Sequence, residues 1–167
     1  MILDLGSSFK PCEPEVIRSP DNNQLLMIMR KNNREYNSWI MISNNESKTW
    51  SEPCQASASV TMDRHQAHYA PDVCLVIVGR DVATNSPSKG HFAAWFGAYQ
   101  DLVEGSEGQY RIKHLHPYKR TEYPGLENLP NGTFVATTSV GYRPGENYSV
   151  VSTRIRFAEL DEMMKQQ

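Results

Sequence analysis

An internal repeat constrains the fold of this chain more than any other feature of its sequence. Three short turn motifs recur along the chain. Each lies between a segment that begins with a polar residue and a segment that is mainly apolar, and the first residues of the turns are Asp21, Asp72 and Asn131. These anchors lie 51 and 59 residues apart. Self-similarity at a period of this length indicates copies of one supersecondary unit arranged side by side, not one irregular core.

Polar side chains occupy matching positions around each anchor. Eight residues before the anchors lie Glu13, Arg64 and Tyr123, and eight or nine residues after them lie Arg30, Arg80 and Ser139. Each unit therefore has the order polar residue, strand, tight turn, apolar strand, polar end. Because Arg30 and Arg80 fall at the equivalent point of two repeats, we interpret them as candidate site residues.

The segments between the turns have the composition of β-strands. They are short, rich in Val, Ile, Phe and Trp, and separated by Asp, Asn, Gly and Pro, as in 25–30 (LLMIMR) and 75–80 (LVIVGR). Asn131-Gly132 is a two-residue hairpin signal, because both residues tolerate positive φ. Helical periodicity is scarce and predicts a short terminal helix over 158–167 and one helical turn over 101–104. The chain is therefore predicted to be all-β with antiparallel hairpins.

A unit of about 50 residues with four short strands has the size of a β-propeller blade. We therefore predict about three four-stranded antiparallel blades within a single domain. Their expected boundaries are about 9–53, 60–116 and 119–160.

Composition excludes several classes of partner. The 167 residues carry a formal net charge of −2, which gives no electrostatic reason to expect nucleic acid or an anionic membrane. There is no apolar run of about 18 residues that could span a membrane, and residues 1–10 lack the pattern of a signal peptide. The three cysteines show no C-x-x-C spacing. His65 and His68 lack a third ligand nearby, so we expect no metal and no cofactor.

One turn motif follows the predicted strand over 38–43. The run Ser43-Asn44-Asn45-Glu46-Ser47-Lys48-Thr49-Trp50 resembles the Asp-box, or BNR repeat, of the sialidase (neuraminidase) superfamily, whose pattern is S-x-D-x-G-x-T-W. Asn45 stands in place of the Asp and Ser47 in place of the Gly. In that family the box is a structural turn between the third and fourth strands of a blade.

Two further segments carry the same resemblance. The segment 123–133 resembles the last blade of sialidases, where a Tyr opens an inner strand ahead of a two-residue turn. The segment 13–30 resembles the sialidase blade that supplies a Glu on one strand and an Arg at the end of the next. The resemblance covers nearly the whole chain but only the C-terminal half of the family's six-bladed propeller, so it implies a half-propeller.

The resemblance implies a catalytic pair. Sialidases use a Tyr nucleophile, an exception to the carboxylate rule for glycosidases. Because a Tyr hydroxyl has a pKa near 10, a neighbouring Glu must take its proton. Tyr123 would be the nucleophile and Glu13 its base, with Glu15 as the out-of-register alternative.

The resemblance also implies an arginine clamp for the substrate carboxylate, since guanidinium groups pair with carboxylates bidentately. Arg30 would be one member, and either Arg80 or Arg64 a second. The remaining Arg and the acid/base Asp would come from the first blades of the family, which this sequence does not include.

These features leave more than one function open. The first expectation is a sialidase-like glycoside hydrolase, or a fragment of one, that acts on or binds acidic sugars such as sialic acid. The alternative is a non-catalytic carbohydrate-binding or structural half-propeller. Unpaired blade flanks predict self-association, with a homodimer completing a six-bladed ring. The sequence does not decide localisation, although members of the family are often secreted or periplasmic.

Overall fold

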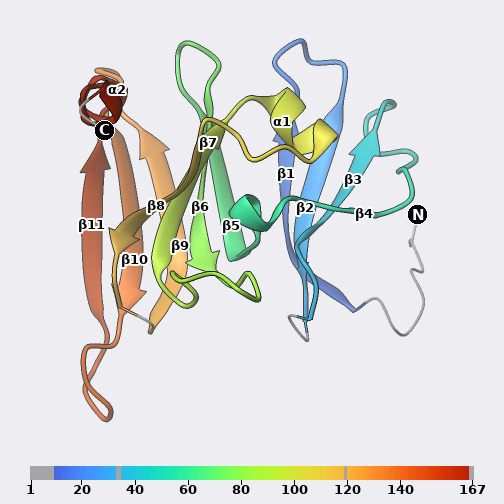
Figure 1. Cartoon of the computed structure of the whole chain (residues 1–167). Coiled ribbons are helices and arrows are strands. Elements are labelled where there is room, and N and C mark those ends of the chain that lie inside the picture. Colours follow the sequence, from blue (N-terminus) through green and yellow to red (C-terminus); the bar gives the residue numbers. More distant parts are fainter. Residues whose placement is uncertain (1–9, 33–34, 119, 166–167) are drawn as a thin grey trace.

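The computed structural model describes residues 10–32, 35–118 and 120–165. It consists of three antiparallel sheets that stand side by side (Figure 1). The first sheet contains β1 (Pro11–Arg18), β2 (Leu25–Lys31), β3 (Trp39–Ser43) and β4 (Cys54–Gln55). The second contains β5 (Met62–Tyr69), β6 (Leu75–Asp81), β7 (Phe92–Gly97) and β8 (Tyr110–His116). The third contains β9 (Thr121–Asn128), β10 (Phe134–Val140) and β11 (Ser149–Ile155).

In the part of the chain that the structure describes, helical structure is limited to short segments. The 3-10 turn η1 (Ala58–Val60) joins the first two sheets, α1 (Tyr99–Glu104) connects β7 to β8, and α2 (Phe157–Lys165) follows β11. The all-β fold class is thus confirmed. The third sheet differs from the expected four strands, because the described chain turns into α2 after β11. No helix in the described residues is long and apolar enough to cross a membrane.

The three repeat anchors form the same kind of turn. In each, the anchor's side-chain oxygen accepts a hydrogen bond from the backbone N–H two residues further on. The distances are 3.1 Å from Asn23 to Asp21, 3.2 Å from Cys74 to Asp72, and 3.1 Å from Thr133 to Asn131. The residue between them has a left-handed backbone, with φ of 62° at Asn22, 62° at Val73 and 74° at Gly132. This Asx-turn geometry explains why each anchor is Asp or Asn.

The turn over Ser43–Trp50 is closed by its own polar groups. The side-chain Oδ1 of Asn45 accepts hydrogen bonds from the Thr49 backbone N–H at 2.9 Å and from the Ser43 hydroxyl at 3.1 Å. Ser43 Oγ in turn accepts the N–H of Ser47 at 3.0 Å. Ser47 has φ of 60°, a conformation that favours glycine. The turn therefore places a left-handed residue where the Asp-box pattern has Gly.

Two apolar clusters hold the sheets together. The first and second sheets pack through residues that include Leu26, Ile28 and Trp95, and the second and third pack through residues that include Phe96 and Phe134. Strand β7 is buried along its whole length, because its alternate side chains face the two neighbouring sheets. Burial of apolar surface on both faces of the middle sheet is the main stabilising contribution of this architecture.

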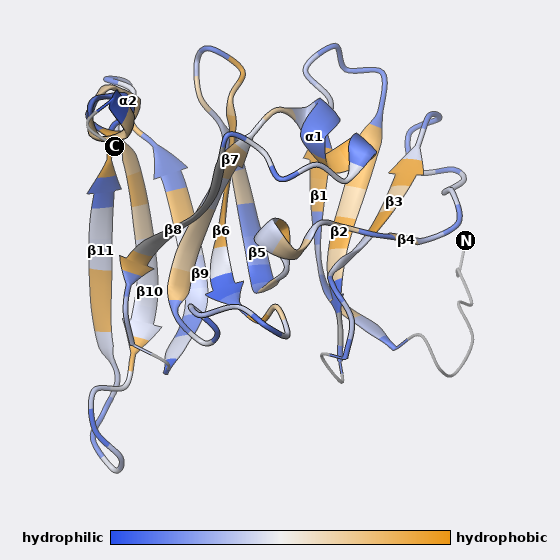
Figure 2. Ribbon diagram, viewed as in Figure 1, coloured by the Kyte–Doolittle hydropathy of each residue, from blue (hydrophilic) through white to orange (hydrophobic). Residues whose placement is uncertain are grey.

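The edge strands β1, β5 and β9 lie next to one another where the three sheets meet. Side-chain bonds join them: the Tyr69 hydroxyl donates to the Arg18 carbonyl at 2.8 Å, and the Asn128 amide donates to the Tyr69 carbonyl at 3.1 Å. Figure 2 shows that β2 and β3 are largely apolar, whereas β5 is predominantly hydrophilic. Strand β5 therefore brings hydrophilic side chains to the place where the three sheets meet.

Candidate functional site

Each of the three edge strands contains a β-bulge close to its start. The strand register shifts between Cys12 and Glu15 in β1, between Asp63 and Gln66 in β5, and opposite Thr137 and Ser139 in β9. The first bulged residue has a positive φ in every case: 54° at Glu13, 55° at Arg64 and 27° at Tyr123. These are the residues eight positions before the anchors. Bulges redirect side chains out of the regular alternation.

The bulges and the ends of the neighbouring strands lie at one end of the sheets. The starts of β1, β5 and β9 are at the lower end in Figure 1. Arg30 at the end of β2 pairs in register with Cys12, and Arg80 at the end of β6 pairs with Asp63. The structure thus brings together Glu13, Arg30, Arg64, Arg80 and Tyr123, the five residues that the sequence proposed.

A buried carboxylate joins two of these arginines. Asp63 is completely buried, with 0% of its side chain exposed. Its Oδ1 lies 2.9 Å from Arg30 Nε, and its Oδ2 lies 2.5 Å from Arg80 Nη2. A buried charge requires partners of this kind, because an unpaired carboxylate in the interior is costly. Asp63 therefore fixes the positions of both guanidinium groups.

Four more ion pairs close the cluster. Glu122 lies 3.5 Å from Arg80 and 3.0 Å from Arg64, measured between side-chain oxygen and nitrogen atoms. Glu13 lies 3.4 Å from Arg64 and 2.5 Å from Arg30. The six side chains form a closed ring of alternating charge, which we call the ion ring. In order, its members are Glu13, Arg30, Asp63, Arg80, Glu122 and Arg64.

The ion ring balances its own charge, with three guanidinium groups against three carboxylates. Burial acts to raise the pKa of Glu13, but the hydrogen bond and charge of Arg30 and the charge of Arg64 outweigh it, so the pKa lies below its usual value. A carboxylate held in its ionised form by two arginines is a weak proton acceptor.

Tyr123 stands beside the ion ring. The Arg64 guanidinium lies over its ring, 4.2 Å from the ring centroid, which is cation–π geometry. The tyrosine is 71% exposed, and within the described residues its hydroxyl makes no hydrogen bond to Glu13. The exposed ring therefore serves as a platform for Arg64.

A pocket of about 360 Å³ opens between the bulges. Its lining includes both bulged residues of every edge strand: Glu13 and Pro14, Arg64 and His65, Tyr123 and Pro124. Gln66 completes the lining. Three different sheets therefore contribute equivalent positions to one concave site.

His65 forms the buried part of this wall, with 2% of the residue exposed. Its Nε2 lies 3.1 Å from the Val60 carbonyl oxygen and 3.2 Å from Ser38 Oγ. Burial lowers the pKa of the imidazole to about 4, against the opposing effects of the Val60 bond and of Asp63. The ring is therefore neutral at physiological pH.

Glu15, the alternative to Glu13, lies elsewhere. Its Oε1 accepts the backbone N–H of Ala67 at 3.2 Å and so ties β1 to β5. Burial raises the pKa of Glu15, partly offset by that hydrogen bond. The geometry thus places Glu13 in the ion ring and gives Glu15 a role in joining sheets.

Sequence reasoning missed two members of the ion ring. Asp63 and Glu122 are not among the candidate residues from the sequence, although Asp63 binds Arg30 and Arg80, and Glu122 binds Arg64 and Arg80. Both missed acids directly precede a bulge residue, nine positions before their anchors, where the first repeat has Cys12. That shared position is the signal that could have found them.

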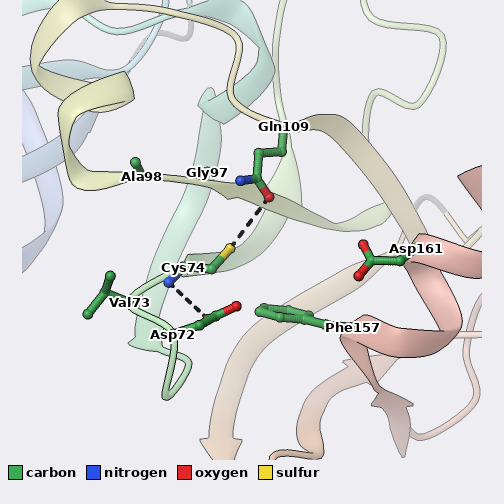
Figure 3. A pocket seen from close by; sticks show the side chains of 8 residues that line it. All are labelled: Asp72, Val73, Cys74, Gly97, Ala98, Gln109, Phe157 and Asp161. Carbon is green, nitrogen blue, oxygen red and sulfur yellow. Dashed lines mark hydrogen bonds between the residues drawn. The ribbon is translucent and has the colours of Figure 1, made fainter.

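A second pocket, of about 380 Å³, lies at the opposite ends of these strands, between the β5–β6 turn and α2 (Figure 3). Its polar groups bind one another: the Cys74 N–H donates to Asp72, and Cys74 Sγ lies 3.9 Å from Gln109 Oε1. Burial raises the pKa of the Cys74 thiol to about 11, so it is not a nucleophile at neutral pH. None of the residues proposed from the sequence line this pocket.

Comparisons with known proteins identify the fold. No family model matches the sequence, and no curated protein matches it. A solved structure described as Bacteroides ovatus xyloglucan PUL GH43B matches with a TM-score of 0.57 at 10% identity, covering 87% of this chain and 27% of that one. The intramolecular trans-sialidase from Ruminococcus gnavus, in complex with oseltamivir carboxylate, matches with a TM-score of 0.57 at 16% identity, covering 89% and 33%.

Both structures are β-propeller glycosidases, so the three sheets have the arrangement of propeller blades. The chain spans about a third or less of the length of these two structures. In the described residues, no group of three or more His, Cys, Asp or Glu side chains could hold a metal ion.

Proposed function

We propose that this set of propeller blades binds a sugar in the pocket between its three bulges. The observation that supports the proposal is the convergence of Glu13, Arg64 and Tyr123, one from each sheet, on a single concave surface. Carboxylate and guanidinium groups offer paired hydrogen bonds to adjacent hydroxyls, and an exposed aromatic ring offers an apolar face. The ion ring holds these groups in place before a ligand arrives.

Two features favour binding over hydrolysis as the primary function. A tyrosine nucleophile needs a neighbouring base, and Glu13 instead pairs with Arg30 and Arg64. Its lowered pKa also makes it a poor acceptor of a phenolic proton. Sugar binding needs neither a proton transfer nor a second catalytic carboxylate.

The sugar we propose is acidic, of the sialic acid class, and its carboxylate would bind Arg64. Among the three arginines of the ion ring, Arg64 has the most exposed side chain and is the one that lines the pocket. The carboxylate would compete with Glu13 and Glu122 for this guanidinium. A neutral sugar would avoid that competition, so the two kinds of sugar must be compared directly.

Titration of the full chain with N-acetylneuraminic acid and with its uncharged methyl ester tests this proposal. We expect binding that Arg64→Ala abolishes and that Arg18→Ala leaves intact, since Arg18 pairs with Glu46 at the other end of β1. Loss of affinity for the ester would support the acidic sugar, and equal affinity would indicate recognition through hydroxyls alone. Failure of the unmodified chain to bind either compound would contradict the proposal.

Sialidase-type hydrolysis is the second candidate, favoured by the exposed position of Tyr123 on the lining of the pocket. In this reading the Tyr123 hydroxyl attacks the anomeric carbon as the glycosidic C–O bond breaks, and Glu13 accepts the phenolic proton. The aglycone leaves and takes a proton from solvent, water then releases the sugar from Tyr123, and Arg30, Arg64 and Arg80 orient the substrate carboxylate. A fluorogenic sialoside assay with Tyr123→Phe as control tests it, because the variant keeps the aromatic platform and removes the nucleophile. Turnover that persists in Tyr123→Phe would contradict the nucleophile role.

We propose also that copies of the chain associate. Strand β11, at the edge of the third sheet, exposes an apolar side chain, that of Val150, which is 81% exposed. Blade flanks of this kind are suited to pack against another blade, and a two-fold pair of chains would extend the ring of blades. A monomer in sedimentation velocity at micromolar concentration would contradict this proposal.

A further inference from the structure

The three bulges differ at their second residue, and the difference points to a specific ligand contact. Bulges in β1 and β9 continue with Pro14 and Pro124, which carry no polar side-chain group. The bulge in β5 continues with His65 at the equivalent position. The second residue of the bulge can therefore be proline, with no polar side chain, and the bulge still forms. In the middle blade the same position instead places an imidazole on the wall of the pocket.

This imidazole has one nitrogen satisfied and one without a partner. Nε2 contacts the Val60 carbonyl, which can only accept, so Nε2 carries the proton. A neutral ring then has an unprotonated Nδ1, which is an acceptor. Within the described residues Nδ1 is buried and has no hydrogen-bond partner. A buried acceptor left unpaired costs about 1–3 kcal/mol, so such groups call for an explanation.

We propose that His65 Nδ1 accepts a hydrogen bond from a hydroxyl group of the sugar bound in the pocket. The inference rests on the proposed sugar-binding function and adds the donor that the pocket requires. A hydroxyl can donate to this nitrogen, whereas an ionised carboxylate has only acceptors and cannot. His65 therefore favours a ligand with a hydroxyl donor at this point, and the ligand's carboxylate, where present, lies toward Arg64.

Two variants of His65 separate ligand recognition from structural support. His65→Gln keeps a donor near the Nε2 position, which can reach the Val60 carbonyl, but has no acceptor at the Nδ1 position. His65→Asn has an acceptor near the Nδ1 position and is too short to reach Val60. A structural role predicts greater loss of thermal stability in His65→Asn. Ligand recognition predicts greater loss of affinity in His65→Gln.

The probes are N-acetylneuraminic acid, its methyl ester and cyclohexanecarboxylate, which has a carboxylate and no hydroxyl. We expect the unmodified chain to bind the two sugars and not cyclohexanecarboxylate. His65→Gln should weaken sugar binding about 3- to 10-fold, the effect of one net hydrogen bond. His65→Asn should weaken it less. In the chain with ¹⁵N-labelled histidine, saturation with sugar should shift the His65 Nδ1 resonance more than the Nε2 resonance.

The outcomes distinguish this inference from the proposed function. Sugar binding that is unchanged in His65→Gln, or a Nδ1 resonance that does not move at saturation, overturns the inference and leaves the sugar-binding proposal standing. Binding of the methyl ester as tight as that of the acid, with loss in His65→Gln, supports the inference and contradicts the acidic-sugar proposal. Absence of any sugar binding, or equal binding of cyclohexanecarboxylate, overturns the role of His65.

Discussion

Arg30 and Arg80 bind opposite oxygens of one buried carboxylate, that of Asp63, at 2.9 and 2.5 Å. The two arginines occupy matching places in successive repeats, at the ends of β2 and β6. One acid therefore links two blades through symmetric contacts. The bridge orients the rest of the ion ring, because Glu13 and Glu122 each bind one of the same two arginines.

Removing the charge of Asp63 should destabilise the whole chain. Asp63→Asn leaves the buried Arg30 and the half-buried Arg80 without their shared partner, and breaking a buried ion pair from one side typically costs about 3–5 kcal/mol. Urea unfolding monitored by tryptophan fluorescence measures the loss. Glu46→Gln is the matched control, because it breaks the exposed pair with Arg18 and should leave the midpoint unchanged. Equal effects of the two variants would contradict a structural role for the ion ring.

The chain should lose stability as the pH falls from about 7 to 4. The pKa of His65 is lowered to about 4 by burial, while the usual value is 6.5, so between these values the unfolded chain takes up a proton that the folded chain excludes. The contribution of neutral His65 to the free energy of unfolding is full above pH 6.5 and is lost toward pH 4. The total change is roughly 3 kcal/mol. Urea unfolding at a series of pH values measures it.

His65→Gln should flatten that pH profile. Asp63 and Glu13 oppose the lowered pKa of His65 and Arg30 reinforces it, and all three remain in the variant. Glu13 has a lowered pKa of its own, so its contribution is also lost in acid and persists in both proteins. The difference between the two profiles isolates His65. His68→Gln changes an exposed histidine of the same strand, and its profile should follow that of the unmodified chain.

Val73→Asn should stabilise the β5–β6 turn. Val73 is 57% exposed and has φ of 62°, which is strained for a β-branched residue. The equivalent residue of the first repeat is Asn22, with the same φ. We expect a gain of about 1 kcal/mol from relief of the left-handed conformation. Val150→Asn, in the extended strand β11, should give no such gain, and a loss in both variants would contradict the argument.

The aromatic ring of Tyr123 should matter for stability, and its hydroxyl should not. Tyr123→Phe keeps the surface on which the Arg64 guanidinium lies, so the unfolding midpoint should not change. Tyr123→Leu removes that surface and should cost about 0.5 kcal/mol, the lower range for an exposed cation–π contact. Unfolding of both variants in parallel, at low and high salt, provides the comparison. A loss in Tyr123→Phe would show that the hydroxyl has a structural partner.

Much of the fold follows from local sequence rules. Each anchor is Asp or Asn because an Asx turn needs a short side-chain acceptor, and the strands between anchors are marked by β-branched and aromatic residues. The repeat also marks the first bulge residue of each edge strand and both strand-end arginines. The third sheet departs from the four-strand pattern because the described chain forms α2 after β11, a choice that the repeat itself does not encode.

The sequence by itself determined the all-β class, the positions of the three turns and the five polar residues that meet at one end of the sheets. Tertiary structure alone decided that Asp63 and Glu122 close the ion ring and that His65 is buried with one nitrogen unpaired. Turns and strands depend on contacts between residues close in the chain, which a local pattern can show. The ion ring joins side chains from different sheets, for example Arg64 and Glu122, 58 residues apart. Which acid binds which arginine is set by how the sheets pack, and that packing determines what the pocket can bind.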